Sequence, residues 1–231
     1  LSVHSVVSWD FAVAIVPGWH ATIFAPYFVA GAIFSGIAMV ITLTVPLRKV
    51  FGLEAYLTTK HYDAMAKLCL MTSLIVFYAY LSEFFMAWYS GEEVERAAFW
   101  ARLFGPYWWA TWTMLVCNGF VPVMLWFKRV RYSIPALFAI SIFVNIGMWF
   151  ERYVIIVTSL HHEYEPFAWG LYRPSGIEMT IVLGSFCWFG FWFLLFTRLL
   201  PPVAIAELKE VLPTPTRPIA AVGAGGHGGD Q

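Results

Sequence analysis

Long apolar runs dominate the chain, and short polar segments separate them. A helix that crosses a bilayer needs about 20 mainly apolar residues. Six runs reach or approach this length: residues 1–16, 25–46, 66–89, 107–127, 135–160 and 177–200. A transmembrane barrel would show short segments of alternating polarity instead. The pattern therefore predicts an all-α protein, a polytopic transmembrane helical bundle with about six spans.

The first apolar run is the shortest, and it stops at Pro17. It begins at Leu1 without an initiator Met and without the basic leader and small-residue cleavage site of a signal peptide. We therefore interpret residues 1–16 as the end of a span and expect an N-terminal portion to precede Leu1. At the other end, residues 201–231 are rich in Pro and then in Gly, which predicts a flexible tail.

Composition agrees with a membrane protein. Hydrophobic residues make up 60% of the 231 residues and charged residues only 12%, against roughly 25% in soluble globular chains. The 14 Lys and Arg balance the 14 Asp and Glu, so net charge gives no reason to expect nucleic acid as a partner. Cys69, Cys117 and Cys187 are isolated within apolar runs, without the spacing of a thiolate site. No metal site is predicted.

Basic residues gather on one set of loops, which predicts the orientation of the chain. The basic set comprises Arg48, Lys49, Lys60, Lys128, Arg129, Arg131, Arg198, Lys209 and Arg217. The remaining loops carry only Arg96, Arg102 and Arg173. By the positive-inside rule the first set is cytoplasmic. The loops 17–24, 90–106 and 161–176 then face outward, and the C-terminus is cytoplasmic.

Small residues in the second run predict close helix packing. Gly31, Ser35 and Met39 recur at four-residue spacing, with Gly36 beside them. Small side chains at this spacing let helix backbones approach closely in a membrane.

Several ionisable side chains lie within the predicted spans. A charge at bilayer depth costs on the order of 3 kcal/mol, so such groups normally face the bundle interior and mark ion or proton routes. The candidates are His4, Asp10, Lys67, Glu83, Glu151 and Arg152.

Glu151 and Arg152 are adjacent, hence about 100° apart on a helix, and cannot pair with each other as residues at i and i+4 can. Each needs a partner on another helix, such as Glu83 or Asn145. Arg152 shares a helix face with Asn145, which suggests a polar seam. One interpretation is a proton path, and the alternative is a buried ion pair that fixes helix register.

Glu83 is predicted to relay protons, because no cation lies near it on its own helix and Tyr80 is one turn away. Lys67 and His61 lie toward the cytoplasmic side and together would form a proton entrance. The alternative for these two residues is ordinary placement at a helix end, where a Lys side chain reaches toward water.

His4 and Asp10 are six residues apart, about 120° on a helical wheel, so they could flank a cavity between helices. Asp10 lies near the predicted outer end of its span. A His and an Asp near one membrane surface could accept the two protons that quinol releases on oxidation. The alternative is an Asp that tethers a loop and a packed His.

Four stretches make the chain similar to a known family. "LSVHSVVSWDFAV", "PGWHATIFAPYFVAGAIFSG", "FGPYWW" and "NIGMWFERYVIIVTSLH" together resemble the C-terminal portion of the NrfD-type family of polysulfide reductase membrane subunits. Within it, the C subunits of alternative complex III are the most similar. The resemblance implies about ten spans in two four-helix bundles with flanking helices. Residues 1–16 would end the first bundle, 25–160 would form the second, and 177–200 would flank them.

The resemblance also implies a quinol site in the first bundle, near the outer surface, to which His4 and Asp10 would contribute. Its other contacts would come from helices upstream of Leu1. The second bundle would hold the proton route. Quinol, with menaquinol expected, is the implied ligand, and the chain would have no redox cofactor of its own. Iron–sulfur clusters and haems would belong to a periplasmic iron–sulfur protein and a multihaem cytochrome, assembled with other membrane subunits in the bacterial inner membrane.

Two other functions compete with quinol oxidation. A proton or ion channel or transporter subunit without quinone chemistry would use Glu83, Arg152 and Lys67 alone, but transporters usually show internal repeats, and the sequence has no convincing one. A b-type cytochrome needs pairs of axial His ligands across a bundle, whereas only His4 lies well inside a span. Quinol oxidation is therefore favoured.

Overall fold

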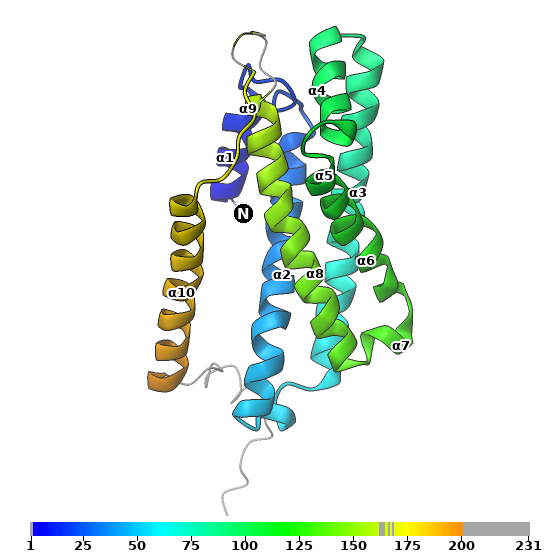
Figure 1. Cartoon of the computed structure of the whole chain (residues 1–231). Coiled ribbons are helices and arrows are strands. Elements are labelled where there is room, and N and C mark those ends of the chain that lie inside the picture. Colours follow the sequence, from blue (N-terminus) through cyan, green and yellow to red (C-terminus); the bar gives the residue numbers. More distant parts are fainter. Residues whose placement is uncertain (1, 162–164, 166, 168, 201–231) are drawn as a thin grey trace, which may run out of the picture. The chain divides into compact units, whose positions relative to one another are not determined.

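The computed structural model describes residues 2–161, 165, 167 and 169–200. These residues form helices with no β-strand among them, which confirms the all-α prediction. The chain divides into two compact units, residues 1–173 and 174–231 (Figure 1). The predicted tail, residues 201–231, lies outside the described residues.

Four helical stretches are long and apolar enough to cross a membrane, and each coincides with a predicted span. They are α2 (Phe24–Val50), α3 (Thr59–Ser90), the continuous stretch Ile134–His161, and α10 (Gly176–Leu199). The stretch Ile134–His161 consists of α8 (Ile134–Tyr153), the π-helical turn η4 (Val154–Thr158) and α9 (Ser159–His161).

The predicted span at residues 107–127 is helical but segmented. It consists of α5 (Trp108–Leu115), the π-helical turn η2 (Val116–Phe120), α6 (Val121–Val123) and the 3-10 turn η3 (Met124–Trp126). Pro122 explains part of the segmentation, because it has no N–H to bond the carbonyl of Asn118 four residues earlier. Hydropathy alone does not reveal these breaks.

The shorter helices lie at the ends of the larger unit. α1 (Ser2–Ala12) covers most of the first apolar run, whereas α4 (Glu93–Phe104) occupies a segment predicted to be an outward loop. The buried residues of α4 are Ala98, Phe99 and Arg102, which fall on one face, so this helix is amphipathic. A scan for long apolar runs misses such a helix. The short elements η1 (Leu53–Ala55) and α7 (Lys128–Arg131) lie in the basic loops.

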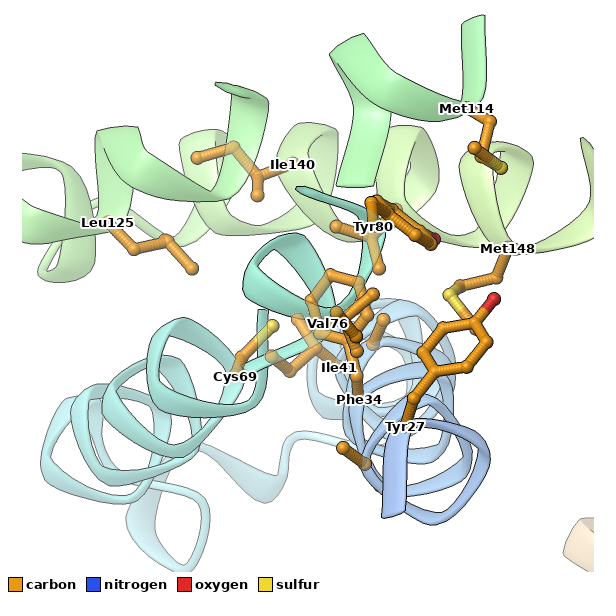
Figure 2. Packing of buried hydrophobic residues seen from close by; sticks show 14 of the residues in the cluster. Tyr27, Phe34, Ile41, Cys69, Val76, Tyr80, Met114, Leu125, Ile140 and Met148 are labelled. Carbon is orange, nitrogen blue, oxygen red and sulfur yellow. The ribbon is translucent and has the colours of Figure 1, made fainter. Parts of the chain in front are cut away.

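The core of the larger unit lies between α2, α3, α8 and the segmented helix. Figure 2 shows the packing of these elements around Phe34, Ile41 and Val76, all of which are exposed by 2% or less. α1 packs against α2 through rings: Phe11 stacks on Phe28 with centroids 5.9 Å apart and lies 5.5 Å from Phe24. Large apolar side chains such as Met71 and Phe85 remain exposed on α3, as expected of a surface that faces lipid.

One of the two glycines of the predicted close-packing motif faces another helix. Gly31 is buried, and a Cβ built on it would lie 3.4 Å from Cε of Met148 on α8. Gly36, in contrast, has nothing within 4 Å of such an atom. Both positions leave room for a methyl group, so the predicted close-packing role of these glycines stays a prediction.

The three segments predicted to face outward meet at one end of the larger unit. His20 pairs with Glu95 of α4, Arg102 of α4 bonds Ser159, and the Tyr107 hydroxyl donates to the carbonyl of Tyr172. We call this end of the bundle the outer end and the opposite one the inner end, following the positive-inside assignment.

The second unit contains α10. Two reciprocal hydrogen bonds cap the N-terminus of this helix. The Glu178 N–H donates to Ser175 Oγ at 3.3 Å, and the Ser175 N–H donates to the Glu178 carboxylate at 2.6 Å. This capping box starts a helix of high hydropathy that is long enough to span a bilayer. Its predicted role as a flanking helix stays a prediction.

Candidate functional site

Glu151 is the centre of a buried polar cluster. The side chain is 1% exposed, and Tyr27 of α2 donates to its Oε1 at 2.7 Å. Tyr80 of α3 donates to Oε2 at 2.6 Å, and the Asn118 amide of η2 donates to Oε2 at 3.3 Å and to the Tyr80 oxygen at 3.0 Å. We call these four residues the Glu151 cluster. Three donors from three other elements offset part of the cost of burying a carboxylate.

Two π-helical turns and a glycine shape the backbone around the Glu151 cluster. Asn118 lies in the π-helical turn η2, and a second π-helical turn, η4, begins three residues after Glu151. Gly147 precedes Glu151 by one turn of α8. A Cβ on Gly147 would collide with the Asn118 side chain and lie 2.6 Å from Cβ of Cys117. The missing side chain therefore lets α8 and η2 approach closely enough for Asn118 to reach the carboxylate.

Glu83 lies on α3, one turn after Tyr80 and toward the outer end. Its Oε1 is buried and has no hydrogen-bond partner among the described residues. It interacts electrostatically with Glu151 and with Arg102 of α4. The sequence shows no cation near Glu83 on its own helix, but the fold brings Arg102 to it from a segment that was expected to be a loop.

Arg102 is itself buried, with 5% of its surface exposed. Its Nη2 donates to Ser159 Oγ at 2.6 Å, and its guanidinium lies 4.5 Å from the centre of the Phe99 ring. Burial lowers the pKa of Arg102, and the negative charge of Glu83 opposes that change. A Cβ on Gly18, whose φ is +80°, would collide with the guanidinium. The Gly18 turn thus leaves the space that Arg102 occupies.

A cavity of about 420 Å³ opens beside Glu83 at the outer end. Its lining comes from the turn after α1, the end of α3 and the start of α4, and includes Gly18, His20, Ser82, Glu83, Glu92 and Glu95. His20 Nε2 lies 2.7 Å from Glu95 Oε1 across this cavity mouth. Polar and ionisable groups therefore extend from the buried Glu151 cluster, through Glu83, to an open cavity.

Arg152 and Asn145 do not form one polar seam, contrary to the sequence prediction. Asn145 donates to Thr42 Oγ1 at 2.9 Å, and Thr42 Oγ1 in turn donates to Ser141 Oγ at 2.9 Å. The Arg152 guanidinium lies instead over the Phe28 ring, 4.2 Å from its centre. Arg152 therefore interacts with an aromatic face, as an Arg at a partly buried site commonly does.

The predicted partners of Glu151 also need correction. Two tyrosines and Asn118 hold the carboxylate, whereas neither Glu83 nor Asn145 is hydrogen-bonded to it in the part of the chain that the structure describes. The carboxylate of Glu83 has the wrong charge sign for such a partner, and Asn145, six residues before Glu151 on α8, donates to Thr42 instead.

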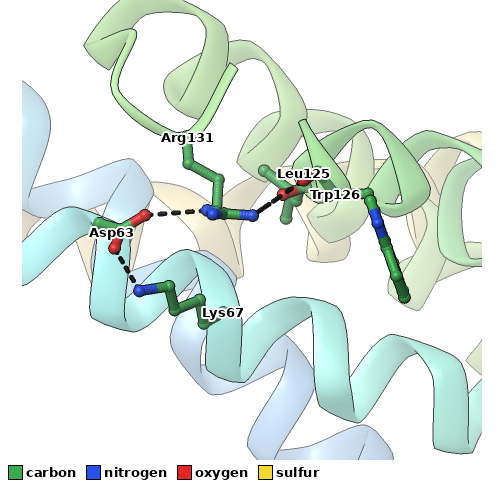
Figure 3. A network of polar contacts seen from close by, with 5 residues as sticks. All are labelled: Asp63, Lys67, Leu125, Trp126 and Arg131. Atoms are coloured by element: carbon green, nitrogen blue, oxygen red, sulfur yellow. Dashed lines mark hydrogen bonds and ion pairs between the residues drawn. The ribbon is translucent and has the colours of Figure 1, made fainter. Parts of the chain in front are cut away.

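The inner end carries an ion cluster around Asp63 of α3 (Figure 3). Lys67 Nζ lies 2.6 Å from Asp63 Oδ2, and Arg131 Nε donates to Asp63 Oδ1 at 2.8 Å. His61 is exposed and accepts a hydrogen bond from the Thr58 N–H at 3.2 Å, which caps the start of α3. The structure thus places Lys67 and His61 at the inner end, near each other along α3 but with different partners.

His4 and Asp10 lie on α1, and both side chains are exposed. The His4 ring lies 6.2 Å from the Phe28 ring, on the ring that Arg152 also contacts. Within the described residues, Asp10 has no hydrogen bond or ion pair, and none joins it to His4. Phe28 therefore connects the α1 candidate His4 to Arg152 of α8, while Asp10 faces out of the chain.

Four residues of these clusters were not singled out from the sequence: Tyr27, Asn118, Arg102 and His20. Asn118 carried a signal, because an amide in the middle of an apolar run needs a partner on another helix. Tyr27 carried none, since tyrosines are common near membrane interfaces. Arg102 and His20 were assigned to outer loops, where polar residues are expected.

A comparison with characterised protein sequences found no match to this chain. A scan against protein families matched the model described as "Polysulphide reductase, NrfD" over residues 1–162, which include α1, the Glu151 cluster and the outer cavity. The match covers well over half of the 231 residues. The chain therefore belongs to the NrfD family, whose members are membrane subunits of quinol or polysulfide oxidoreductase complexes.

Proposed function

We propose that the chain is the quinol-binding membrane subunit of a respiratory quinol:electron-acceptor oxidoreductase of the alternative complex III type. Quinol, with menaquinol expected, loses two protons and two electrons at the outer end and becomes quinone. The protons leave outward, and the electrons pass to clusters and haems of periplasmic partner subunits. The chain acts in the bacterial inner membrane, with its C-terminus in the cytoplasm, and holds no redox cofactor of its own.

His4 and Asp10 are the proposed quinol contacts. Both project from the surface of α1, so their polar atoms are accessible to a ligand or to neighbouring helices. Asp10 lies two residues before the end of α1 at the outer end, where a carboxylate can accept a proton and release it to water. Exposed polar side chains on an apolar helix are costly in lipid, which supports a covered site between α1 and other helices.

The second part of the proposal is a proton path through the bundle. Its outer half runs from the Glu151 cluster to Glu83 and then to the outer cavity, where Glu83 is part of the wall. Hydroxyl and carboxyl groups in contact can pass a proton along a chain of hydrogen bonds. Lys67 and His61 form the inner entrance, and Arg152 braces α8 against α2 through Phe28.

One observation carries the proposal most strongly: a buried carboxylate held by two tyrosine hydroxyls inside a membrane bundle, with a second carboxylate one turn farther toward an open cavity. A channel or transporter could use the same groups. Quinol chemistry is favoured over that alternative by the family, whose members belong to redox complexes.

The test is Asp10→Asn in the assembled complex, with steady-state oxidation of a water-soluble menaquinol analogue as the measurement. Asn keeps the shape of the side chain but cannot accept the proton, so we expect the turnover number to fall about a hundredfold. Glu54→Gln, an exposed carboxyl in η1 at the inner end, is the control and should oxidise quinol like the wild type. Unchanged quinol oxidation in Asp10→Asn would refute the assignment of Asp10.

A further inference from the structure

A second cluster of ligand-type atoms lies at the mouth of the outer cavity. His20, from the turn after α1, and Glu92 and Glu95, from the start of α4, place one ligand atom each within 4.8 Å of the others. All three line the cavity that also contains Glu83. We propose that His20, Glu92 and Glu95 bind a divalent transition-metal ion, with Zn²⁺ as the best match.

The orientation of the His20 ring supports a ligand role. Its Nδ1 lies 3.2 Å from the carbonyl oxygen of Val16, four residues earlier. A carbonyl can only accept, so Nδ1 carries a hydrogen and Nε2 points to the Glu95 carboxylate. Backbone carbonyls commonly fix metal-binding His rings in this way, which leaves the other ring nitrogen for the metal.

The 2.7 Å separation of His20 Nε2 and Glu95 Oε1 needs a proton or a metal ion between these two acceptor atoms, because the hydrogen of the neutral ring is already on Nδ1. A Zn–N and a Zn–O bond of about 2.1 Å each, at a tetrahedral angle, would place the His20 nitrogen and the Glu95 oxygen about 3.4 Å apart. Zn²⁺ therefore enters after the two side chains separate by less than about 1 Å, and Glu92 and water complete the coordination.

Glu83 provides an observation independent of the His20 cluster. Its Oε1 is buried and has no hydrogen-bond partner among the described residues, and other atoms of the same residue line the cavity. A cation bound in this cavity would stabilise the negative charge of the Glu83 carboxylate, which Arg102 faces from α4. Arg102, which interacts electrostatically with Glu83, donates to Ser159 and is not among the residues that line the cavity.

The composition of the cluster selects the metal class. One imidazole and two carboxylates suit Zn²⁺ and its first-row neighbours, whereas Mg²⁺ and Ca²⁺ prefer oxygen ligands alone. The ordinary explanation for Glu92 and Glu95 is that acidic side chains stabilise the N-terminus of a helix. Glu93, between them, meets that explanation equally well but is not among the three candidate ligands, so it is a matched control.

The experiment measures Zn²⁺ affinity of the metal-stripped complex containing the full chain in nanodiscs, by competition with a chromophoric chelator. We expect His20→Gln and Glu95→Gln each to lower the affinity of one site by about tenfold or more, and Glu93→Gln to leave it unchanged. Partner subunits that bind Zn²⁺ contribute equally to all four proteins, so the difference between them isolates this site.

Two further measurements keep the test decisive. Glu92→Gln changes an exposed side chain that makes no hydrogen bond or ion pair with the described residues, so it reports on binding even where His20→Gln does not assemble. Co²⁺ added in place of Zn²⁺ should give visible absorption bands of a four-coordinate site in the wild type and lose them in Glu92→Gln. Equal Zn²⁺ affinity in the wild type, Glu92→Gln and Glu95→Gln would overturn the proposal, as would tight competition by Mg²⁺.

Discussion

At the scale of single residues, Glu151 shows how a bundle in lipid keeps a carboxylate. The charge is not paired with a cation, although Arg152 is its neighbour in sequence, because the two side chains leave α8 in different directions. Two hydroxyls and an amide take the place of a cation. Hydrogen bonds to charged groups are worth about 1.5–3 kcal/mol each, and breaking one leaves a buried group unsatisfied.

The two tyrosines of the Glu151 cluster are not equivalent. The Tyr80 hydroxyl donates to Glu151 and accepts from Asn118, whereas the Tyr27 hydroxyl only donates to Glu151. We expect Tyr80→Phe to destabilise the protein by about 1–3 kcal/mol and Tyr27→Phe by less. Thermal unfolding of the purified complex measures the difference. Tyr78→Phe, on the exposed side of α3, is the control, and an equal effect of all three would contradict the cluster.

Residue chemistry also decides which site residues the sequence could reveal. Glu83, Glu151 and Arg152 stood out because charges in apolar runs are rare. Tyr27 did not, because an aromatic residue in a span has many uses. The Asn118 amide indicates that a partner exists, but the sequence does not reveal that partner before the helices are packed. Arg102 did not stand out either, because four other charged residues lie in the same segment, and such a segment is predicted to be a solvated loop.

At the scale of elements, the two π-helical turns flank the Glu151 cluster. η2 contains Asn118, and η4 begins just beyond Glu151. A π-helical turn adds a residue to a helix and re-aims the side chains around it, and such turns are frequent at functional sites. The segmented helix is therefore what positions the Asn118 amide between Tyr80 and Glu151.

Gly147 should be essential for this arrangement. A methyl group there would overlap the Asn118 side chain and Cβ of Cys117, so the helices must separate. We expect Gly147→Ala to destabilise the complex by about 1–3 kcal/mol, measured by thermal unfolding. Gly36→Ala, on α2 with open space around the site, should be neutral or slightly stabilising because Ala favours helix. A larger loss in Gly36→Ala than in Gly147→Ala would reverse this interpretation.

Hydropathy predicted the long helices well and the short ones poorly. The predicted spans 25–46, 66–89 and 135–160 fall within helices that extend beyond them at both ends, and the span 177–200 differs from α10 by one residue at each end. α4 was missed because half of its surface is polar, and only its packing against the outer end makes it a helix with a buried face. The breaks around Pro122 depend on local hydrogen bonding, which an average over about 20 residues cannot resolve.

At the scale of the whole larger unit, polar groups lie in layers along the bundle. The Asp63 ion cluster is at the inner end, the bonds of Asn145 with Thr42 follow, and then come the Glu151 cluster and the outer cavity. Asn145 and Glu151 are six residues apart on α8, about 9 Å along the axis. Outward of Glu151 the proposed path has a second carboxyl, Glu83, and an open cavity. The core that packs between α2 and α3 contains apolar side chains such as Phe34 and Val76.

The place of Glu83 beside the outer cavity assigns it to the exit half of the path. Replacing Glu83 with Gln removes the carboxyl that receives a proton from the Glu151 cluster but keeps its size and polarity. Because Glu83 is on α3 and the proposed quinol contacts are on α1, we expect proton translocation per electron to fall by at least half while quinol oxidation and quinol affinity stay near wild-type values. Reconstituted vesicles report both quantities, through a pH-sensitive dye and through quinol absorbance.

The ratio of the two losses discriminates between mechanism and damage. An equal fall of proton translocation and quinol oxidation would mean that Glu83→Gln only weakens the fold, since a collapsed outer end affects both activities. Unchanged translocation would remove Glu83 from the path, because Gln cannot be deprotonated as a carboxyl can. A selective loss would leave one physical explanation: a proton crosses the outer half of the bundle through a carboxyl that faces the cavity, separately from the quinol at α1.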